Sequence, residues 1–173
     1  AREVDRLEAQ FTARGEAFFH VSGAGHEAVA ALSPHLKPVD WLHCHYRDKA
    51  LMLARGVTPE MFFASLFCKD ASHSRGRQMS AHMSWRADNV LSLCGPVGNN
   101  ALQAVGVAAE VRDGDGAPLV VCALGDGTTQ ECEVLEAIAE AVRDSLPVLF
   151  LVEDNHLAIS TLTQHKTFYS LPE

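Results

Sequence analysis

The sequence predicts an α/β fold, with a mostly parallel sheet and helices on both of its faces. Residues 119–124 and 148–152 form two continuous apolar runs of strand length, which are typical of parallel strands covered on both sides. Between them, residues 130–144 place apolar and acidic side chains on separate stripes at helical spacing. A strand, a helix and a strand in this order predict two neighbouring parallel strands joined by a right-handed crossover.

Helical composition also marks several segments upstream of this unit. We expect these helices at about residues 2–18, 25–32, 48–55, 59–67 and 101–111. The last segment is small and apolar almost all round, as in a buried helix. Residues 69–84 are polar and basic without a period, which predicts a loop. No internal repeat or linker divides the chain, so we expect a single domain, or part of one, over residues 1–173.

The composition excludes several classes of protein. The chain has 173 residues, of which 47% are hydrophobic and 21% are charged. A chain of this size and composition can bury a core without a disulfide or a metal, so a disordered or fibrous protein is excluded. Its net charge of −8 argues against binding to nucleic acid or to an anionic membrane. No apolar stretch is long enough to span a membrane. The five cysteines form no CxxC pair, which favours reduced thiols inside a cell.

Polar residues follow both predicted strands directly. Asp126 comes after the first strand and Asn155 after the second. Because the carboxyl ends of parallel strands meet at one edge of a sheet, we expect the two side chains to converge there. Carboxylate and amide oxygens suit Mg²⁺, which keeps further places for water and phosphate. Gly125 and Gly127, on either side of Asp126, allow a sharp turn and a close approach of backbone N–H groups to a phosphate.

Other interpretations of these residues remain open at this point. Each strand-end motif alone is more often a simple turn. An aspartate at a strand end also suits a Mg²⁺-dependent phosphate-transfer enzyme, although the sequence shows neither the nucleophile nor the phosphate-binding lysine that such an enzyme needs. The segment His43-Cys44-His45 resembles a zinc ligand cluster but lacks a second pair at metal spacing; His45 could instead lie near a cofactor. Asp113-Gly114-Asp115-Gly116 lacks the later acidic ligand of a calcium loop and predicts a turn.

Further motifs occur in a definite order along the chain. They are Gly25-His26-Glu27-Ala28, His45-Tyr46-Arg47-Asp48, Gly76-Arg77-Gln78-Met79-Ser80-Ala81-His82, Gly125-Asp126-Gly127, Glu136-Ala137, Leu146-Pro147-Val148 and Glu153-Asp154-Asn155-His156-Leu157-Ala158-Ile159-Ser160-Thr161. In this order they resemble the alpha subunit of thiamine diphosphate-dependent 2-oxoacid dehydrogenase complexes, over nearly the whole chain. The motif that ends in His82 leans towards the branched-chain members of that family over the pyruvate members.

The resemblance implies a set of cofactor and metal contacts. It assigns thiamine diphosphate contacts to Tyr46, Arg47, Gly95, Val97, Asp126, Gly127, Thr128 and Asn155, and Mg²⁺ ligation to Asp126, Asn155 and the Leu157 carbonyl oxygen. Tyr46 and Arg47 would reach the diphosphate, and an arginine suits this role because its planar fork can donate two hydrogen bonds to one phosphate. Gly95 and Val97 would contact the aminopyrimidine ring through their backbone.

The chain departs from the family pattern at two of these motifs. The family usually has a second asparagine where Asp154 stands and a glycine where Cys132 stands. The catalytic-loop histidine of the family lies beyond the last residue of this sequence, so the catalytic residues are not assigned. Because the sequence also lacks an initiator methionine, we expect a truncated, partial thiamine diphosphate-binding domain.

The function that the resemblance implies is the oxidative decarboxylation of a 2-oxoacid, either branched-chain or pyruvate, with thiamine diphosphate and Mg²⁺. The acyl unit would pass to a lipoyl-bearing acyltransferase, and a beta subunit or a fused beta half would complete the site, as in a heterotetramer. We expect no nucleic-acid or membrane partner, and a place in the bacterial cytoplasm in preference to the mitochondrial matrix. The alternatives are another thiamine enzyme, such as an acetoin dehydrogenase or a transketolase-like protein, and a truncated, non-catalytic subunit.

Overall fold

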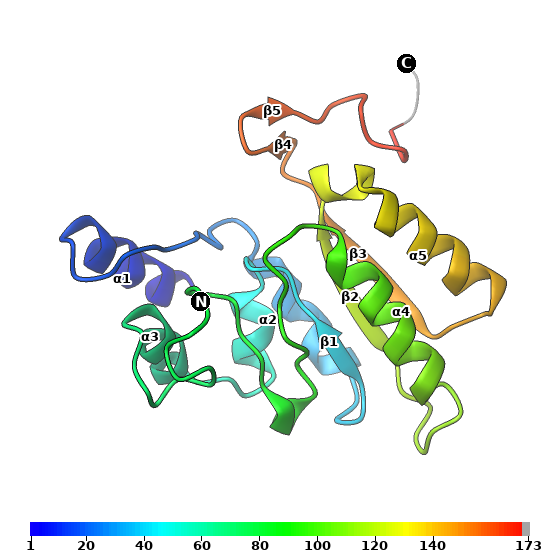
Figure 1. Ribbon diagram of the computed structural model, residues 1–173, viewed down its shortest axis with the longest axis horizontal. Coiled ribbons are helices and arrows are strands. Elements are labelled where there is room, and N and C mark those ends of the chain that lie inside the picture. Colours follow the sequence, from blue (N-terminus) through cyan, green and yellow to red (C-terminus); the bar gives the residue numbers. More distant parts are fainter. Residues whose placement is uncertain (171–173) are drawn as a thin grey trace. The chain divides into compact units, whose positions relative to one another are not determined.

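The computed structural model describes residues 1–170, which fold into two compact units (Figure 1). The first unit contains residues 1–38 and 46–93. The second contains residues 39–45 and the chain from Cys94 onward. The short segment 39–45 thus belongs to the second unit, although the residues on either side of it belong to the first.

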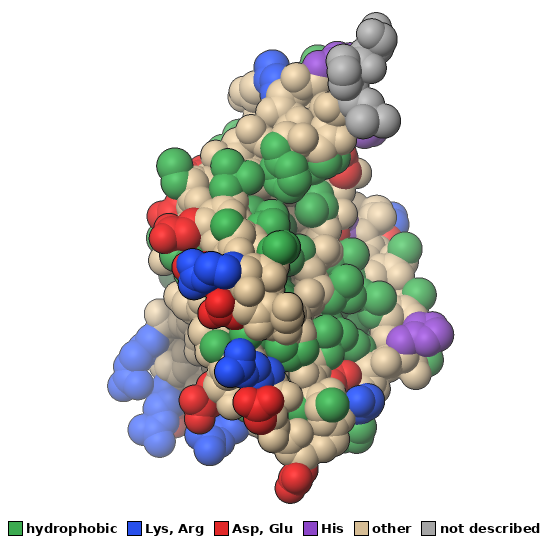
Figure 2. All heavy atoms as spheres, turned by 90° about the vertical axis from the view of Figure 1, so that its right-hand side faces the viewer, with side chains coloured by type: hydrophobic (Ala, Val, Ile, Leu, Met, Phe, Trp, Pro, Cys, Tyr) green, Lys and Arg blue, Asp and Glu red, His purple; other side chains and the backbone are tan. Residues whose placement is uncertain are grey.

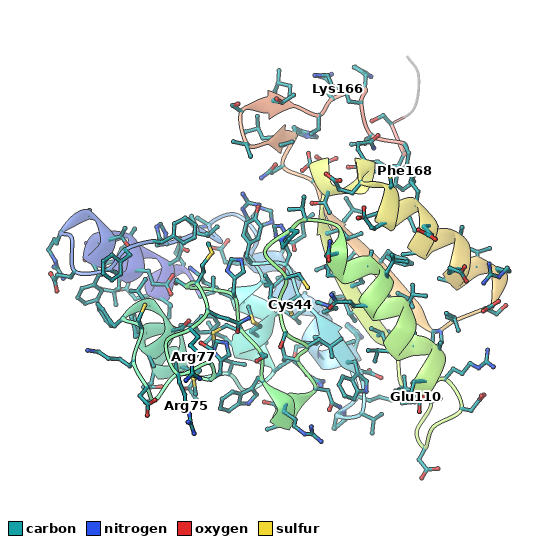
Figure 3. All side chains as sticks on the ribbon, viewed as in Figure 1. Cys44, Arg75, Arg77, Glu110, Lys166 and Phe168 are labelled. Atoms are coloured by element: carbon teal, nitrogen blue, oxygen red, sulfur yellow. The ribbon has the colours of Figure 1, made fainter. Side chains whose placement is uncertain are left out.

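The first unit consists of short helices and irregular segments. Its elements are α1 (Arg2–Ala13), the 3-10 helix η1 (Glu27–His35), α2 (Lys49–Ala54), α3 (Pro59–Leu66) and the 3-10 turn η2 (Arg86–Asp88). The helices predicted at 48–55 and 59–67 are confirmed, and so is the loop at 69–84. Arg75 and Arg77 extend from this loop and are exposed (Figure 3).

Two of the helix predictions for this unit are wrong in part. The helix expected to reach residue 18 ends at Ala13, because the chain turns at Gly15, whose φ of 74° is a left-handed conformation that glycine adopts without strain. The helix expected at 25–32 is a 3-10 helix that continues to His35. Pro34 lies inside it and lacks the N–H that an α-helix would bond at that position.

A buried ion-pair network connects α1 to the start of α2. Lys49 is 1% exposed, and its ammonium contacts the carboxylates of Asp5, at 2.8 Å, and Glu8. It also donates to the Val21 carbonyl oxygen at 2.9 Å. Burial raises the pKa of the Glu8 carboxyl, and the contact with Lys49 opposes this rise only in part. For Asp5 burial is also the largest effect and would raise the pKa, but hydrogen bonds from Lys49 and from neighbouring groups outweigh it and the pKa is lowered.

The second unit contains the sheet. Its elements are β1 (Trp41–His43), α4 (Asn99–Val111), β2 (Val120–Gly125), the 3-10 turn η3 (Gly127–Gln130), α5 (Cys132–Arg143), β3 (Val148–Glu153), β4 (Leu157–Ala158) and β5 (Thr161–Leu162). The first three strands in chain order form a parallel sheet in the order β1-β2-β3, and β4 and β5 form a separate antiparallel hairpin.

The register of the sheet confirms the predicted strand, helix and strand unit. β2 and β3 are parallel neighbours, with Val120 opposite Val148 and Gly125 opposite Glu153, so both strands end at the same edge. β1 pairs with the other side of β2, with Trp41 opposite Val120. The sequence did not predict β1 or the hairpin, because strands of two or three residues are too short to show a periodic pattern.

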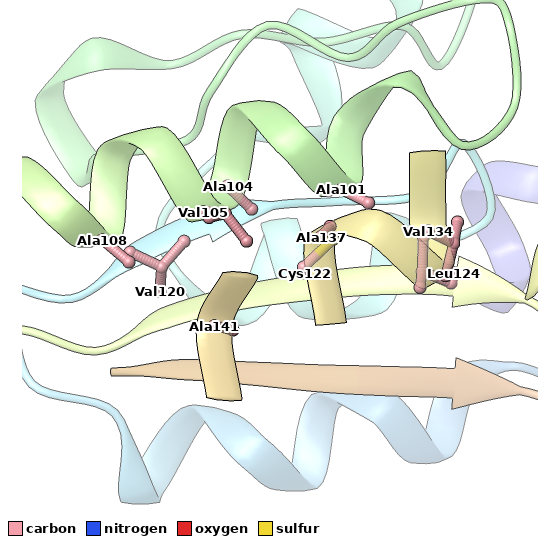
Figure 4. Packing of buried hydrophobic residues seen from close by; sticks show 10 residues of the cluster. All are labelled: Ala101, Ala104, Val105, Ala108, Val120, Cys122, Leu124, Val134, Ala137 and Ala141. Carbon is pink, nitrogen blue, oxygen red and sulfur yellow. The ribbon is translucent and has the colours of Figure 1, made fainter. Parts of the chain in front are cut away.

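The core of the second unit lies between β2 and the helices α4 and α5 (Figure 4). Val120, Cys122 and Leu124 alternate along β2 and point towards these helices. The helices present mainly small side chains at this contact: Ala101, Ala104, Ala108, Ala137 and Ala141. Val121 and Ala123, on the opposite face of β2, are also buried. The predicted α/β class, with a parallel sheet flanked by helices, is confirmed.

Some apolar side chains of the second unit remain at its surface. Val142 on α5 is 73% exposed and Leu149 on β3 is 38% exposed. Figure 2 faces the side on which α5 lies in Figure 1 and shows apolar side chains interspersed with charged ones there. Among residues 1–170, no helix is both long and apolar enough to cross a membrane.

Candidate functional site

Asp126 lies at the carboxyl end of β2, where the strand passes into the 3-10 turn η3. Its side chain is 2% exposed, although it belongs to an ionisable residue. The Asp126 carbonyl oxygen accepts hydrogen bonds from the Thr129 amide at 3.2 Å and from the Thr129 hydroxyl at 2.6 Å. The backbone that carries the carboxylate is therefore fixed on its own turn. A buried carboxylate at a strand end needs polar partners to offset its desolvation.

The two glycines beside Asp126 lie close to side chains of other segments. A Cβ placed at Gly127 would stand 2.5 Å from the Ala158 Cβ on β4, so only glycine fits under the hairpin without a shift. A Cβ at Gly125 would stand 3.7 Å from His45 Nε2. His45 follows β1 and is 7% exposed. The short distance to Gly125 shows that its ring lies beside the Gly125–Asp126 turn. The alternative in which His45 belongs to this site, and not to a zinc cluster, is the one that the geometry favours.

The turn after β3 is organised by two side chains that bind backbone amides. Asp154 Oδ1 accepts from the His156 amide at 2.8 Å, and Asn155 Oδ1 accepts from the Leu157 amide at 3.0 Å. The Tyr169 hydroxyl donates to the other carboxylate oxygen of Asp154 at 2.8 Å. Gly125 pairs with Glu153 at the last position of the two strands, so Asp126 and Asp154 both follow at the same edge of the sheet.

These contacts shift the pKa values of both Asp154 and Tyr169. Burial raises the pKa of Tyr169 to about 12, and the hydrogen bond to Asp154 adds to that rise. For Asp154 burial is again the largest effect and would raise the pKa, but hydrogen bonds from the His156 amide and the Tyr169 hydroxyl outweigh it and the pKa is lowered. Both shifts favour the states that these groups ordinarily have at neutral pH, an ionised Asp154 and a protonated Tyr169. The extra acidic residue at this motif thus has two specific hydrogen-bond donors.

The loop that enters α4 lies at the same end of the sheet. A Cβ at Gly98 would stand 2.8 Å from the Glu131 Cβ, and the Asn100 amide donates to the Ala123 carbonyl oxygen of β2 at 2.8 Å. Gly95 and Val97 precede this contact directly, and a Cβ at Gly95 would meet nothing within 4 Å. Both residues therefore lie on the loop that leads to the strand edge where Asp126 lies.

The segment after the hairpin packs onto the Asp126 turn, a contact that no sequence pattern predicted. The Thr163 hydroxyl donates to Asp126 Oδ2, and Thr163 is 6% exposed. With the Gln130 amide oriented to suit its neighbours, its nitrogen donates to the Lys166 carbonyl oxygen at 3.1 Å and its oxygen accepts from the Phe168 amide at 3.0 Å. Figure 3 shows Lys166 and Phe168 on this segment. No sequence signal identified the pair, because 37 residues separate Thr163 from Asp126.

The donor atoms at this edge fit a hard cation that a phosphate helps to hold. Asp126 offers a carboxylate, Asn155 an amide oxygen and Leu157 a carbonyl oxygen, and the hydrogen bond between Asn155 and Leu157 places the last two residues in one turn. In the described part of the chain, no three His, Cys, Asp or Glu residues are grouped to hold a metal. A Mg²⁺ ion at this edge would therefore need ligands from a bound phosphate as well, which Mg²⁺ commonly takes.

Comparison with known proteins shows the family. The dehydrogenase E1 component family matches residues 1–170. The chain belongs to this family. An E1 alpha subunit of Arabidopsis thaliana, the mitochondrial 2-oxoisovalerate dehydrogenase subunit alpha 1, is 29% identical over 91% of this chain and 34% of its own length.

Two other relatives extend this range of organisms and names. The 2-oxoisovalerate dehydrogenase subunit alpha of Bacillus subtilis (strain 168) is 30% identical over 92% of this chain and 49% of its own length. The mitochondrial pyruvate dehydrogenase E1 component subunit alpha of Dictyostelium discoideum is 32% identical over 83% of this chain and 38% of its own length. The E1 chain described here thus spans about a third to a half of the length of these relatives.

Tyr46 and Arg47 of this E1 chain lie in the first unit. Arg47 Nη1 donates to the Tyr46 hydroxyl at 3.0 Å, and the guanidinium lies 4.7 Å from the centre of the Tyr46 ring. The His82 ring stacks on the Tyr46 ring, with the two ring centroids 6.2 Å apart. His82 Nδ1 lies 3.0 Å from the Ser80 carbonyl oxygen. The pair is therefore ordered within its own unit, and its predicted contact with a diphosphate at Asp126 stays a prediction.

The remaining candidate sites of this E1 chain are structural. His43 is 1% exposed and its Nε2 lies 3.0 Å from Gln103 Oε1. Burial lowers the pKa of His43, and the Gln103 contact opposes this only in part. The segment from Asp113 to Gly116 forms a turn, in which the Gly114 amide donates to Val111 and the Ala117 amide to Gly114. The five cysteines form no disulfide; Cys44 (Figure 3) and Cys122 are buried, and Cys94 is half-buried.

Proposed function

We propose that this chain is the thiamine diphosphate-binding portion of the alpha part of a 2-oxoacid dehydrogenase. The main observation behind the proposal is the buried Asp126 carboxylate at the carboxyl end of β2. It lies beside Gly127, a position that has no room for a side chain. Family membership over residues 1–170 supports the same conclusion. In a parallel sheet this edge is where ligands bind.

The cofactor would be held through its diphosphate and a Mg²⁺ ion. Asp126, Asn155 and the Leu157 carbonyl oxygen would bind the ion, and Arg47 with Tyr46 would bind the phosphates. The amides of Gly127 and Thr128 begin the turn η3, where helical N–H groups have no acceptor within the helix, so they would donate to the same anion. The backbone at Gly95 and Val97 would contact the aminopyrimidine ring.

The chemistry that thiamine diphosphate supplies when bound is a nucleophilic carbon for the substrate ketone and an electron sink for the loss of carbon dioxide. This chain contributes orientation and charge neutralisation. The Arg47 guanidinium donates to the Tyr46 hydroxyl, and this contact aligns it. Because the net charge of the chain is −8, a diphosphate must be bound by local groups of this kind, not by the field of the whole protein.

The substrate class follows from the relatives. Their names contain 2-oxoisovalerate and pyruvate, which are both 2-oxoacids. We therefore infer oxidative decarboxylation of a branched-chain 2-oxoacid or of pyruvate, with transfer of the acyl group to a lipoyl group on an acyltransferase. A beta subunit, separate or fused, would complete the active site in a heterotetramer.

The experiment uses the full-length protein combined with its beta partner, thiamine diphosphate and Mg²⁺. Release of carbon dioxide is followed from 2-oxoisovalerate and from pyruvate. We expect release from at least one of them, and a loss of ~10-fold or more in the Asp126→Asn variant. The matched control is Asp113→Asn, in a remote turn, which should leave the rate unchanged. No release from either 2-oxoacid with the wild-type protein would overturn the proposal.

A further inference from the structure

Thr163 is a buried hydroxyl residue to which the proposed function gives no role. It follows β5 directly and lies among exposed neighbours, since Thr161, Leu162 and Gln164 are all exposed. Its hydroxyl donates to Asp126 Oδ2. A hydroxyl that is turned inward to a buried carboxylate, at an otherwise exposed hairpin, indicates a specific contact between the two residues.

The backbone of Thr163 is fixed on both sides of the side chain. Its amide donates to the His156 carbonyl oxygen at 3.1 Å, and its carbonyl oxygen accepts from the Lys166 amide at 2.9 Å. The Thr163 methyl group lies 4.0 Å from the position of a Cβ at Gly127. The β-branched side chain is therefore packed by its methyl group against the turn while its hydroxyl is directed at Asp126.

A carboxylate that binds a cation has to be held in one orientation. Hydrogen-bond partners behind a metal ligand provide this, and their loss commonly weakens metal binding. Asp126 is 2% exposed, so a neutral donor on its Oδ2 also offsets part of the cost of burying the carboxylate.

We propose that Thr163 is the positioning residue of the metal site: its hydroxyl holds Asp126 Oδ2 and thereby orients the carboxylate for a divalent cation. This inference rests on the proposed function, because it takes Asp126 as a ligand of the cation that accompanies thiamine diphosphate. It assigns to the hairpin β4–β5 a part in metal affinity in addition to its packing on Gly127.

The test measures the Mg²⁺ concentration dependence of thiamine diphosphate binding by calorimetry, on the full-length protein with its beta partner. Thr163→Val keeps the shape of the side chain and removes the hydroxyl, and Thr163→Ser keeps the hydroxyl. Thr161→Val, on the same hairpin but exposed, is the matched control. We expect Thr163→Val to weaken the apparent Mg²⁺ affinity ~10- to 100-fold. The apparent Mg²⁺ affinity of Thr163→Ser should stay within about threefold of the wild-type value. The affinity of Thr161→Val should equal that of the wild type.

Each outcome decides the inference. Equal Mg²⁺ affinity in wild type and Thr163→Val would overturn it, and tighter binding in Thr163→Val would overturn it too, because Thr163 would then compete with the cation for Asp126. A loss in Thr163→Val that Thr163→Ser does not recover would show a packing role only. Absence of Mg²⁺-dependent binding in the wild type would instead reject the proposed function. Thermal unfolding of the three variants shows whether each one is folded.

Discussion

Gly127 and Ala158 approach so closely that a Cβ at Gly127 would stand 2.5 Å from the Ala158 Cβ and 3.3 Å from its Cα. The turn that carries Asp126 and the hairpin that carries Thr163 are thus in direct contact. Because the obstructing atoms belong to a short side chain and to the backbone, neither can move aside without a shift of the hairpin. The contact makes the hairpin sensitive to the smallest possible change at Gly127.

Gly127→Ala is therefore expected to destabilise the hairpin by ~1–3 kcal/mol, the usual cost of an overpacked contact. Hydrogen exchange of the amides from Leu157 to Leu162 measures the effect, and exchange should become faster. The control is Gly106→Ala on α4, where a Cβ meets nothing within 4 Å and the residue is exposed. That variant should gain ~0.5–1 kcal/mol from helix propensity. Unchanged exchange of the hairpin in Gly127→Ala would contradict the close contact.

The buried network at Lys49 predicts unequal roles for its two carboxylates. The pKa of Asp5 is lowered and that of Glu8 is raised, both against a background of burial, so Asp5 is the better partner of Lys49 at neutral pH. Asp5→Asn should then cost ~3–5 kcal/mol, because the Asp5 carboxylate also accepts from the Ser22 hydroxyl and the Gly23 amide, and its loss leaves the buried ammonium with Glu8, whose ionised form burial disfavours. Glu8→Gln should cost ~1 kcal/mol or less. Urea unfolding of the two variants compares them directly, and equal costs would show that Glu8 is an equal partner.

His43 makes the stability of the second unit dependent on pH. Burial lowers its pKa in the folded state, so the unfolded chain binds more protons than the folded chain below the ordinary histidine pKa of about 6.5. Stability should be complete above that pH and fall as the pH decreases from there towards the folded pKa. The slope due to this residue is at most ~1.4 kcal/mol per pH unit.

The check compares the free energy of unfolding at two pH values on either side of 6.5 in the wild type and in His43→Gln. The glutamine can still bond Gln103 and does not titrate. The wild type should lose more stability on acidification than the variant does. An identical loss in both proteins would mean that His43 has an ordinary pKa, contrary to its burial.

The parts of the fold that the sequence predicted are those with long local patterns. β2 and β3 are six residues each, and their continuous apolar character was enough to predict strands, their parallel pairing and the place of Asp126 at the strand edge. The cover expected on both faces holds for β2, which is buried, whereas β3 is only half-buried and Leu149 is exposed. α5 was predicted because its two stripes are well separated. Gly15 is a helix-stop signal that was present in the sequence but was outweighed by the charged and apolar residues around it.

The parts of the fold that could not be predicted from the sequence depend on contacts between residues far apart in the chain. β1 has three residues and forms only because β2 offers a free edge to pair with. Thr163 contacts Asp126 from beyond the paired strands β4 and β5, 37 residues along the chain, and no local pattern in the sequence encodes that contact. Asp154 was recognised as a departure from the family pattern, but its bond to Tyr169 depends on the path of the chain after the hairpin.

The most direct test of the account is calorimetric titration of thiamine diphosphate into the full-length protein with its beta partner, with and without Mg²⁺, for the wild type, Asp126→Ala and Asp113→Ala. Asp113 is a suitable control because its side chain is 88% exposed and lies in a turn. We expect tight binding that requires Mg²⁺ in the wild type and in Asp113→Ala, and a loss of ~10- to 100-fold or more in Asp126→Ala. Equal, Mg²⁺-dependent binding by wild type and Asp126→Ala would contradict the assignment of Asp126 as the metal ligand.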